Sequence, residues 1–127
     1  IESSVFEGCS SLISIIVSSN NINYSSVEGV LFNKDKTELI CCPNAKVGAY
    51  IIPDSVTTIR HSAFEDCIKL NRIHCQIKNI KNVKIETDIF EGYDLSNCIL
   101  YVPTGTDNDY KHHPVFSKFK NIVIDEY

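Results

Sequence analysis

The sequence has no methionine, no long apolar run and no excess of basic residues. Its most apolar stretches, such as ISIIV and ELICC, are far shorter than the roughly 18 residues of a membrane-spanning helix. We therefore expect no direct membrane insertion. Lys and Arg together number 12 against 16 Asp and Glu, which gives a net charge of -4. Because no basic stripe is visible, we also expect no nucleic-acid partner.

Motifs of enzymatic chemistry are missing as well. The sequence contains no nucleophile elbow, phosphate-binding loop or metalloprotease motif. Two histidine groupings suggest a metal at first sight, namely His74 with Cys67 and Cys75, and His112 with His113. Neither grouping has the paired ligand spacing of a zinc site, and adjacent helical residues diverge by about 100°. We therefore expect no metal, no cofactor and no enzymatic activity.

What the sequence does contain is a repeat within one globular domain of 127 residues, of which 43% are hydrophobic. The segments IESSVFEGC, IRHSAFEDC and IETDIFEGY begin at positions 1, 59 and 85. Their phenylalanines, Phe6, Phe64 and Phe90, lie 58 (64 - 6) and 26 (90 - 64) positions apart. The shorter spacing matches the roughly 20 to 29 residue period of leucine-rich repeats, and the longer one indicates two coils with about a dozen inserted residues.

Each copy predicts a capped helical turn followed by a strand. A cap residue two before the phenylalanine and a glutamate directly after it form a capping box: Ser4 with Glu7, Ser62 with Glu65, and Asp88 with Glu91. The apolar residues that follow alternate as in a half-buried strand: Leu12, Ile15 and Val17; Leu70, Ile73 and Cys75; Leu95, Cys98 and Leu100. One such unit cannot bury its Phe and Leu alone, so the units are expected to stack around a shared core.

Prolines and polar turns predict where the strands end. Pro43, Pro53 and Pro103 each follow two apolar residues, and proline lacks the N–H of a ladder bond. The segment VEGVLFNKDKTELICCP has two apolar runs around the turn NKDKT, which predicts a β-hairpin. In the tail, Thr106 is expected to cap a short helix that Pro114 ends, and NIVID is expected to form a last strand.

The predicted fold is therefore β-rich α/β: a leucine-rich-repeat solenoid with short capped helical turns, an inserted β-hairpin and a C-terminal cap. We expect one domain over residues 1–127. Residues 1–23 are the first coil, 24–49 an irregular coil with the hairpin, 50–103 two further coils, and 104–127 the cap. Because the chain begins inside a repeat unit and has no methionine, we expect it to be the C-terminal part of a longer protein.

The units IPDSVTTIRHSAFEDCIKLNRI and SVFEGCSSLISI resemble the BspA-like, Treponema pallidum-type leucine-rich repeats. The ending LYVPTGTDNDYKHHPVFSKFKNIVIDEY is similar to the terminal cap of such proteins from gut Bacteroides. Tyr93 in place of a cysteine, and Cys75 and Cys98 at aliphatic positions, depart from the pattern. The resemblance implies a cell-surface or secreted protein that acts in adhesion, with a host or microbial surface protein, or a glycan, as its partner.

The six cysteines are expected to be free thiols, most of them in the core. Cys9 and Cys67 hold the same repeat position about two coils apart, and a strand spacing of roughly 4.8 Å leaves them too far apart for a disulfide. Cys75 and Cys98 fall diagonally on adjacent strands, where a bond is geometrically awkward. Cys41 and Cys42 should point to opposite faces of one strand.

The face of the strands that points away from the core is the candidate binding face. Its expected residues are Ser14, Ile16 and Ser18 in the first coil, Arg72, His74 and Gln76 in the second, and Asn97, Ile99 and Tyr101 in the third. Exposed aliphatic and aromatic residues beside an arginine are typical of protein-contact patches. A solvated face, or one that the hairpin covers, explains the pattern equally well. We therefore hold two functional hypotheses: a non-enzymatic binding module, and a structural spacer that presents another domain at the cell surface.

Overall fold

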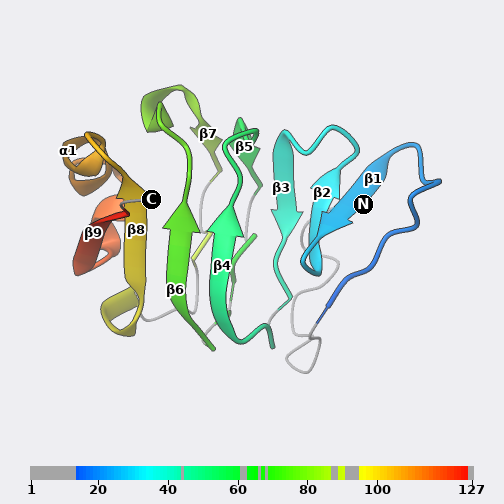
Figure 1. The fold of residues 1–127 in the computed structure, drawn as a ribbon, viewed down its shortest axis with the longest axis horizontal. Coiled ribbons are helices and arrows are strands. Elements are labelled where there is room, and N and C mark those ends of the chain that lie inside the picture. The colour runs from blue at the N-terminus through cyan, green and yellow to red at the C-terminus, as the bar shows by residue number, and fades with distance from the viewer. Residues whose placement is uncertain are drawn as a thin grey trace.

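The computed structural model describes residues 14–43, 45–60, 63–65, 67, 69–86, 89–90 and 95–125. Its strands form two sheets, one of four strands in the order β4-β6-β8-β9 and one of five in the order β1-β2-β3-β5-β7. Figure 1 shows β4, β6 and β8 side by side nearer the viewer, with β5 and β7 behind them. A leucine-rich-repeat solenoid has this layered form, because each coil adds one strand to each side of a common core.

The four-stranded sheet is entirely parallel. It consists of β4 (Gly48–Ile52), β6 (Leu70–Cys75), β8 (Ile99–Pro103) and β9 (Asn121–Asp125). Inward side chains such as Ile73 and Leu100 are completely buried, whereas the residues directly before and after them along each strand reach the surface. The apolar alternation in the sequence therefore predicted β6. It also predicted a strand at β8, which begins at Ile99 rather than at Asn97, and NIVID forms β9 as expected.

The five-stranded sheet begins with two antiparallel hairpins. Its strands are β1 (Tyr24–Val27), β2 (Val30–Asn33), β3 (Glu38–Cys41), β5 (Thr58–Ile59) and β7 (Lys84–Ile85). The predicted hairpin around NKDKT is confirmed as β2 and β3. The β1–β2 hairpin was not predicted; it turns through Glu28 and Gly29, both with positive φ (51° and 83°). This pair of angles is typical of the tight turn that suits the twist of paired strands.

A column of aromatic rings runs through the core between the sheets. The rings of Phe64 and Phe90 are stacked at 5.4 Å between centroids, and Tyr50 lies 6.2 Å from Phe64. Phe90 also meets Phe116 and Phe119 edge-on at 6.1 and 5.2 Å. The expected sharing of repeat phenylalanines between neighbouring coils is confirmed for Phe64 and Phe90, while Phe6 lies outside the described residues.

The turn of the second repeat copy is short. Ala63, Phe64 and Glu65 lie in a turn in which the Ala63 N–H donates to the Arg60 carbonyl at 3.1 Å and the Cys67 N–H donates to the Phe64 carbonyl at 3.2 Å. These contacts span three residues, as in a single tight helical turn. The predicted cap residues Ser4, Ser62 and Asp88, with Glu7 and Glu91, lie outside the described residues.

The first copy departs from the expectation. Residues 14–18 form no strand. Instead, the Ile15 N–H donates to the Gly29 carbonyl at 2.8 Å and the Val17 N–H donates to the Ser26 hydroxyl at 3.0 Å. The segment therefore lies beside the β1–β2 hairpin. Ile15 and Val17 are only half-buried, against a small separate cluster of Leu31, Ile40 and Cys41.

Short helices separate the strands from β6 to β9. The 3-10 helices η2 (Ile80–Asn82), η3 (Leu95–Asn97) and η4 (Phe116–Lys118) each form one turn, and α1 (Asp107–Lys111) is the one α-helix among the described residues. Thr106 stands at the start of α1 as predicted. Its hydroxyl, however, donates to the Pro103 carbonyl at 2.7 Å and makes no capping bond to the helix. No helix in the described part of the chain is long and apolar enough to cross a membrane.

The cysteines of the described ranges, Cys41, Cys42, Cys67, Cys75 and Cys98, are all buried. Cys42 belongs to the main core and Cys41 to the small cluster, which confirms that these two neighbours point to opposite faces. Burial raises the pKa of Cys75 to about 11, so its thiol is protonated at neutral pH. The burial agrees with the expected packing role of these side chains. Cys9 lies outside the described residues.

Candidate binding surface

The strand register builds one continuous surface on the side of the four-stranded sheet that points away from the core. Ile51 pairs with His74, His74 with Tyr101, and Tyr101 with Val123, so these four side chains form a row across all four strands. A second row runs through Ala49, Arg72, Ile99 and Asn121. We call these two rows together the outer face.

An aromatic pair stands at the centre of the outer face. The His74 and Tyr101 rings are nearly parallel, at 4.5 Å between centroids and 9° between planes. The His74 Nδ1 atom lies 2.6 Å from the Asp125 Oδ2 atom, and since a carboxylate oxygen accepts, the imidazole N–H donates to it. His74 is thus contacted by Tyr101 of β8 and by Asp125 at the end of β9, the two strands that follow β6 in the sheet. The pair is a rigid feature on which a partner can bind without ordering these side chains first.

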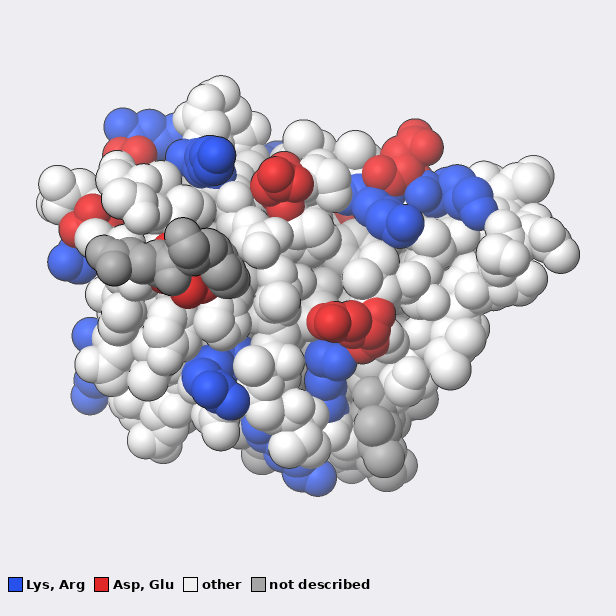
Figure 2. Space-filling view, viewed as in Figure 1, with Lys and Arg blue, Asp and Glu red and all other residues white. Residues whose placement is uncertain are grey.

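Aliphatic side chains flank the aromatic pair. Ile51 is 39% exposed and Val123 is 43% exposed, one on each side of the pair. Figure 2 shows mainly uncharged side chains over the middle of β4 and β6, with charged groups closer to the strand ends. This arrangement, an apolar centre with a polar rim, is typical of surfaces that contact proteins.

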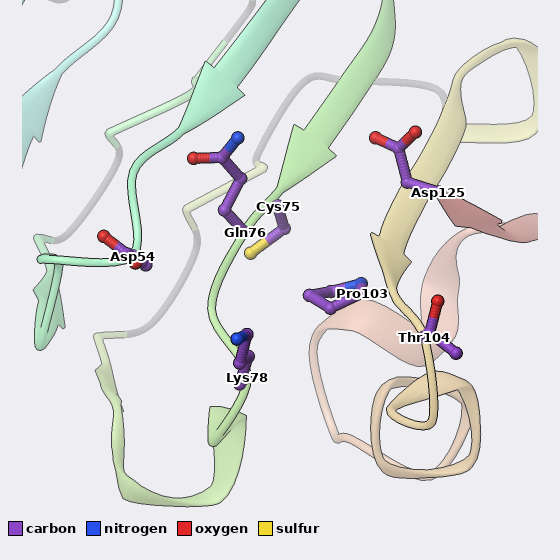
Figure 3. Close-up of a pocket in the computed structure, with 7 residues that line it drawn as sticks. All are labelled: Asp54, Cys75, Gln76, Lys78, Pro103, Thr104 and Asp125. Atoms are coloured by element: carbon purple, nitrogen blue, oxygen red, sulfur yellow. The ribbon is translucent and has the colours of Figure 1, made fainter. Parts of the chain in front are cut away.

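An open pocket of about 470 Å³ adjoins the outer face at the C-terminal ends of the strands. The ladder between β6 and β8 ends at the His74–Tyr101 pair, although β6 runs on to Cys75 and β8 to Pro103. Figure 3 shows the residues that line the pocket, around the gap between these strands: Asp54, Cys75, Gln76, Lys78, Pro103, Thr104 and Asp125. We call it the strand-end pocket.

Buried polar contacts hold Cys75, one of the lining residues, and the segment that follows it. The Tyr110 hydroxyl donates to the Ile77 carbonyl at 2.6 Å and lies 3.1 Å from the Cys75 sulfur. Burial raises the pKa of Tyr110 far above its usual value, so the hydroxyl keeps the proton that it donates. Helix α1 is thereby tied to Cys75, which lines the pocket, and to the residues that follow β6.

The structure brings only part of the predicted binding face together. Arg72, His74, Ile99 and Tyr101 lie on the outer face, and Gln76 follows β6 and lines the strand-end pocket. Asn97 is exposed, but it belongs to η3 before β8 rather than to a strand, because the strand begins only at Ile99.

Ser14, Ile16 and Ser18 were expected on the same face, and this expectation was wrong. They are exposed in the segment that lies beside the β1–β2 hairpin, and the described residues of this segment form no strand and do not pair with the four-stranded sheet. Ile16 is 86% exposed there. Sequence reasoning in turn missed Ile51, Val123 and Asp125, whose strands could have been aligned with β6 and β8 through the apolar alternation of AYIIP and NIVID.

The histidines that suggested a metal have other contacts. The His112 Nδ1 atom lies 2.7 Å from the Asn108 carbonyl, and the His113 Nδ1 accepts from the Val115 N–H at 3.0 Å. Burial lowers the pKa of His113. Across the described ranges, no group of three or more His, Cys, Asp or Glu side chains has a geometry that could hold a metal ion.

Comparison with known families and structures agrees with the geometry. A sequence model of the family described as BspA type leucine rich repeat region (6 copies) matches residues 36–125. The match covers β3 to β9, the part of the chain in which strands add in parallel, and leaves out the first hairpin. A search of curated proteins found no significant match.

Two solved structures resemble the chain. A leucine-rich repeat protein from Eubacterium ventriosum is 23% identical with a TM-score of 0.55, over 94% of this chain and 28% of that protein. The pneumococcal vaccine antigen PcpA is 16% identical with a TM-score of 0.42, over 90% of this chain and 50% of that protein. The chain thus spans half or less of either protein, and the first likeness supports the fold alone.

Proposed function

Since the chain belongs to the BspA-type leucine-rich repeat family, we propose that it is a binding module that recognises a protein partner through the outer face. Repeat proteins of this kind present extended surfaces built from equivalent positions of successive coils. The observation that carries the proposal is the row Ile51, His74, Tyr101 and Val123, which crosses all four parallel strands. The proposed role is non-enzymatic, because binding through a sheet face needs no reactive group.

The chemistry of the row favours a protein partner. Tyr101 offers a ring and a hydroxyl with few rotatable bonds, and Arg72 on the neighbouring strand offers a charged fork for hydrogen bonds. Ile51 and Val123 extend the apolar area on both sides. Tyrosine and arginine are the residue types that most often dominate binding energy at protein interfaces. We therefore place the centre of the interface at Tyr101.

The setting that we propose is adhesion at a cell surface, or action as a secreted protein, with a host or microbial surface protein as partner. Family resemblance supports this setting, and a glycan is the alternative ligand. Antibody labelling of intact source cells with and without permeabilisation tests the location. Labelling that appears only after permeabilisation contradicts it.

Binding is tested on arrays of extracellular host proteins, microbial surface proteins and glycans. For any protein that binds, we expect Tyr101→Ala to weaken binding by about 5- to 30-fold, which corresponds to about 1–2 kcal/mol. Arg72→Ala should weaken it less. Lys84→Ala is the matched control for Arg72, because Lys84 is an exposed strand cation on the five-stranded sheet.

Three outcomes separate the hypotheses. Binding that Tyr101→Ala weakens and Lys84→Ala leaves unchanged supports the outer face. Binding that neither change affects rejects this face. A chain that binds no array component is expected of a structural spacer and contradicts the binding module. Circular dichroism of each variant establishes that the fold is retained.

A further inference from the structure

The strand-end pocket lies where a proline in β8 interrupts the hydrogen bonds between β6 and β8. The Gln76 N–H donates to the Ile52 carbonyl at 3.0 Å, so the backbone N–H and C=O groups of Gln76 point toward β4. Because backbone groups alternate along a strand, Cys75 and Ile77 direct theirs toward β8. The next ladder donor on β8 falls at Pro103, which has no N–H. The two strands therefore separate here.

Both walls of the pocket remain fixed on their far sides. The β6 wall is bonded to β4 through Gln76, and the β8 wall is paired with β9 as far as Pro103 and Asp125. The Tyr110 hydroxyl ties helix α1 to the carbonyl of Ile77, which lies between the lining residues Gln76 and Lys78. A volume of about 470 Å³ lies within the usual range of ligand pockets. The opening is thus preformed and needs no rearrangement to admit a side chain.

Hydrogen-bond acceptors outnumber cationic donors in the lining. Asp54 and Asp125 contribute carboxylates, and Lys78 is the one cation among the residues that line the pocket. Figure 3 shows Asp54 and Asp125 on opposite sides of the gap, with Gln76, Cys75 and Pro103 between them. Asp125 already accepts from His74 through Oδ2. Within the described part of the chain, no ion pair joins Asp54 to another residue.

We propose that the strand-end pocket takes a cationic side chain, an arginine, from the protein partner of the outer face. This inference rests on the proposed function for the source of the arginine. A guanidinium has five donors and no acceptor, which matches two carboxylates and the oxygens of Gln76 and Thr104. Because the pocket begins at Cys75, directly after His74, a protein partner that covers the aromatic pair also reaches this opening.

Lys78 gives the proposal a second, opposite consequence. Its ammonium lines the same pocket and repels an incoming cation. Neutralising Lys78 should therefore tighten the binding of a guanidinium, whereas neutralising Asp54 should weaken it. A ligand that is anionic, or that is held only by apolar contacts, does not produce this pair of opposite effects.

The test is an NMR titration of the chain with N-acetyl-L-arginine methylamide at low ionic strength. We expect saturable shifts at the backbone amides of Gln76, Lys78 and Thr104. Asp54→Asn should raise the dissociation constant by about two- to five-fold, and Lys78→Gln should lower it by a similar factor. Asp35→Asn is the matched control, because Asp35 is an exposed aspartate in the β2–β3 turn, and it should leave the constant unchanged.

N-acetyl-L-glutamate methylamide, the uncharged citrulline analogue and glucose are titrated in parallel. Equal shifts with any of these, or weaker arginine binding after Lys78→Gln, overturn the proposal, as does the absence of any shift with arginine. These readouts are independent of the partner screen. If Tyr101→Ala weakens a partner while arginine leaves the pocket unaffected, only the assignment of the pocket fails.

Discussion

The coils from β4 onward and the two hairpins before them use the same kinds of residue in different ways. From β4 onward, each strand lies parallel to the next, and inward side chains such as Ile52 and Ile73 are completely buried in one shared core. In the hairpins, β1 is half-buried along its whole length. The buried residues of β2 and β3 divide between two clusters: Val30, Phe32 and Leu39 belong to the shared core, whereas Leu31, Ile40 and Cys41 form a separate small cluster. The hairpin strands β2 and β3 thus bury side chains on both of their faces, whereas β6 and β8 bury only the face that points into the shared core.

Loss of a ring from the shared core should destabilise the protein more than any other change considered below. Phe64→Ala removes a ring that stacks on Phe90 and lies near Tyr50, in a site that is completely buried. We expect a loss of about 3–5 kcal/mol in the free energy of unfolding, measured by urea denaturation. Hydrogen exchange should quicken in both sheets, because both contribute to this core. Faster exchange confined to the five-stranded sheet contradicts a shared core.

The small cluster offers the matching experiment. Ile40→Ala creates a cavity beside Leu31 and Cys41, where half-buried Ile15, Val17 and Tyr24 are able to move inward. We expect a cost of about 2 kcal/mol, at the low end for buried aliphatic truncation, because the half-buried neighbours of Ile40 relax into the space that it leaves. Exchange should quicken in β1 to β3 while β6 and β8 keep their protection. If β6 and β8 lose protection equally, the two regions are one cooperative unit.

The turn between β1 and β2 is tight, and a side chain at its glycine is expected to be strained. Gly29 has φ = 83°, and a Cβ there lies 2.8 Å from the Ser14 hydroxyl oxygen. Gly29→Ala should therefore cost about 1–2 kcal/mol through backbone strain and the displacement of Ser14. Gly48→Ala is the control, since its φ is 88° but a Cβ meets nothing within 4 Å. Equal losses in the two variants mean that only the backbone strain matters.

Protonation of His113 should change the stability of the protein by less than the substitutions above. Burial holds the pKa of His113 below its usual 6.5, and its Nδ1 accepts from the Val115 N–H only when neutral. The unfolded chain takes up the proton more readily, so this contribution to stability is present above pH 6.5. It is lost as pH falls through the lower pKa of the folded state. His113→Asn keeps an acceptor without titrating, and the difference in unfolding midpoint between it and the natural protein should change only below pH 6.5.

Local pattern was enough to predict the strands with long alternation and the hairpin around NKDKT. The two-residue strands β5 and β7 left no such signal, because two residues define no period. The first copy misled for another reason. Its alternation matches that of Leu70 to Cys75, but the β1–β2 hairpin supplies its hydrogen bonds. Tertiary context therefore overrode a correct local pattern.

The candidate surface was predictable in part for similar reasons. Arg72, His74, Ile99 and Tyr101 followed from alternation within single strands. The contact between His74 and Asp125 joins residues 51 positions apart, and neither residue carries a local sign of the other. The strand-end pocket depends on where two ladders stop, which requires the register of β6 against β8 as well as the position of Pro103.

The parallel register of the outer face has a consequence for how such a surface evolves. Every added coil extends the rows by one more strand, at about 4.8 Å per coil, without disturbing those already in place. The length of the surface and its residue types can therefore change separately. Duplication of a coil changes the length of the surface, and point substitution on one strand changes the side chains that this strand exposes. The area of such a surface is therefore expected to increase in proportion to the number of coils.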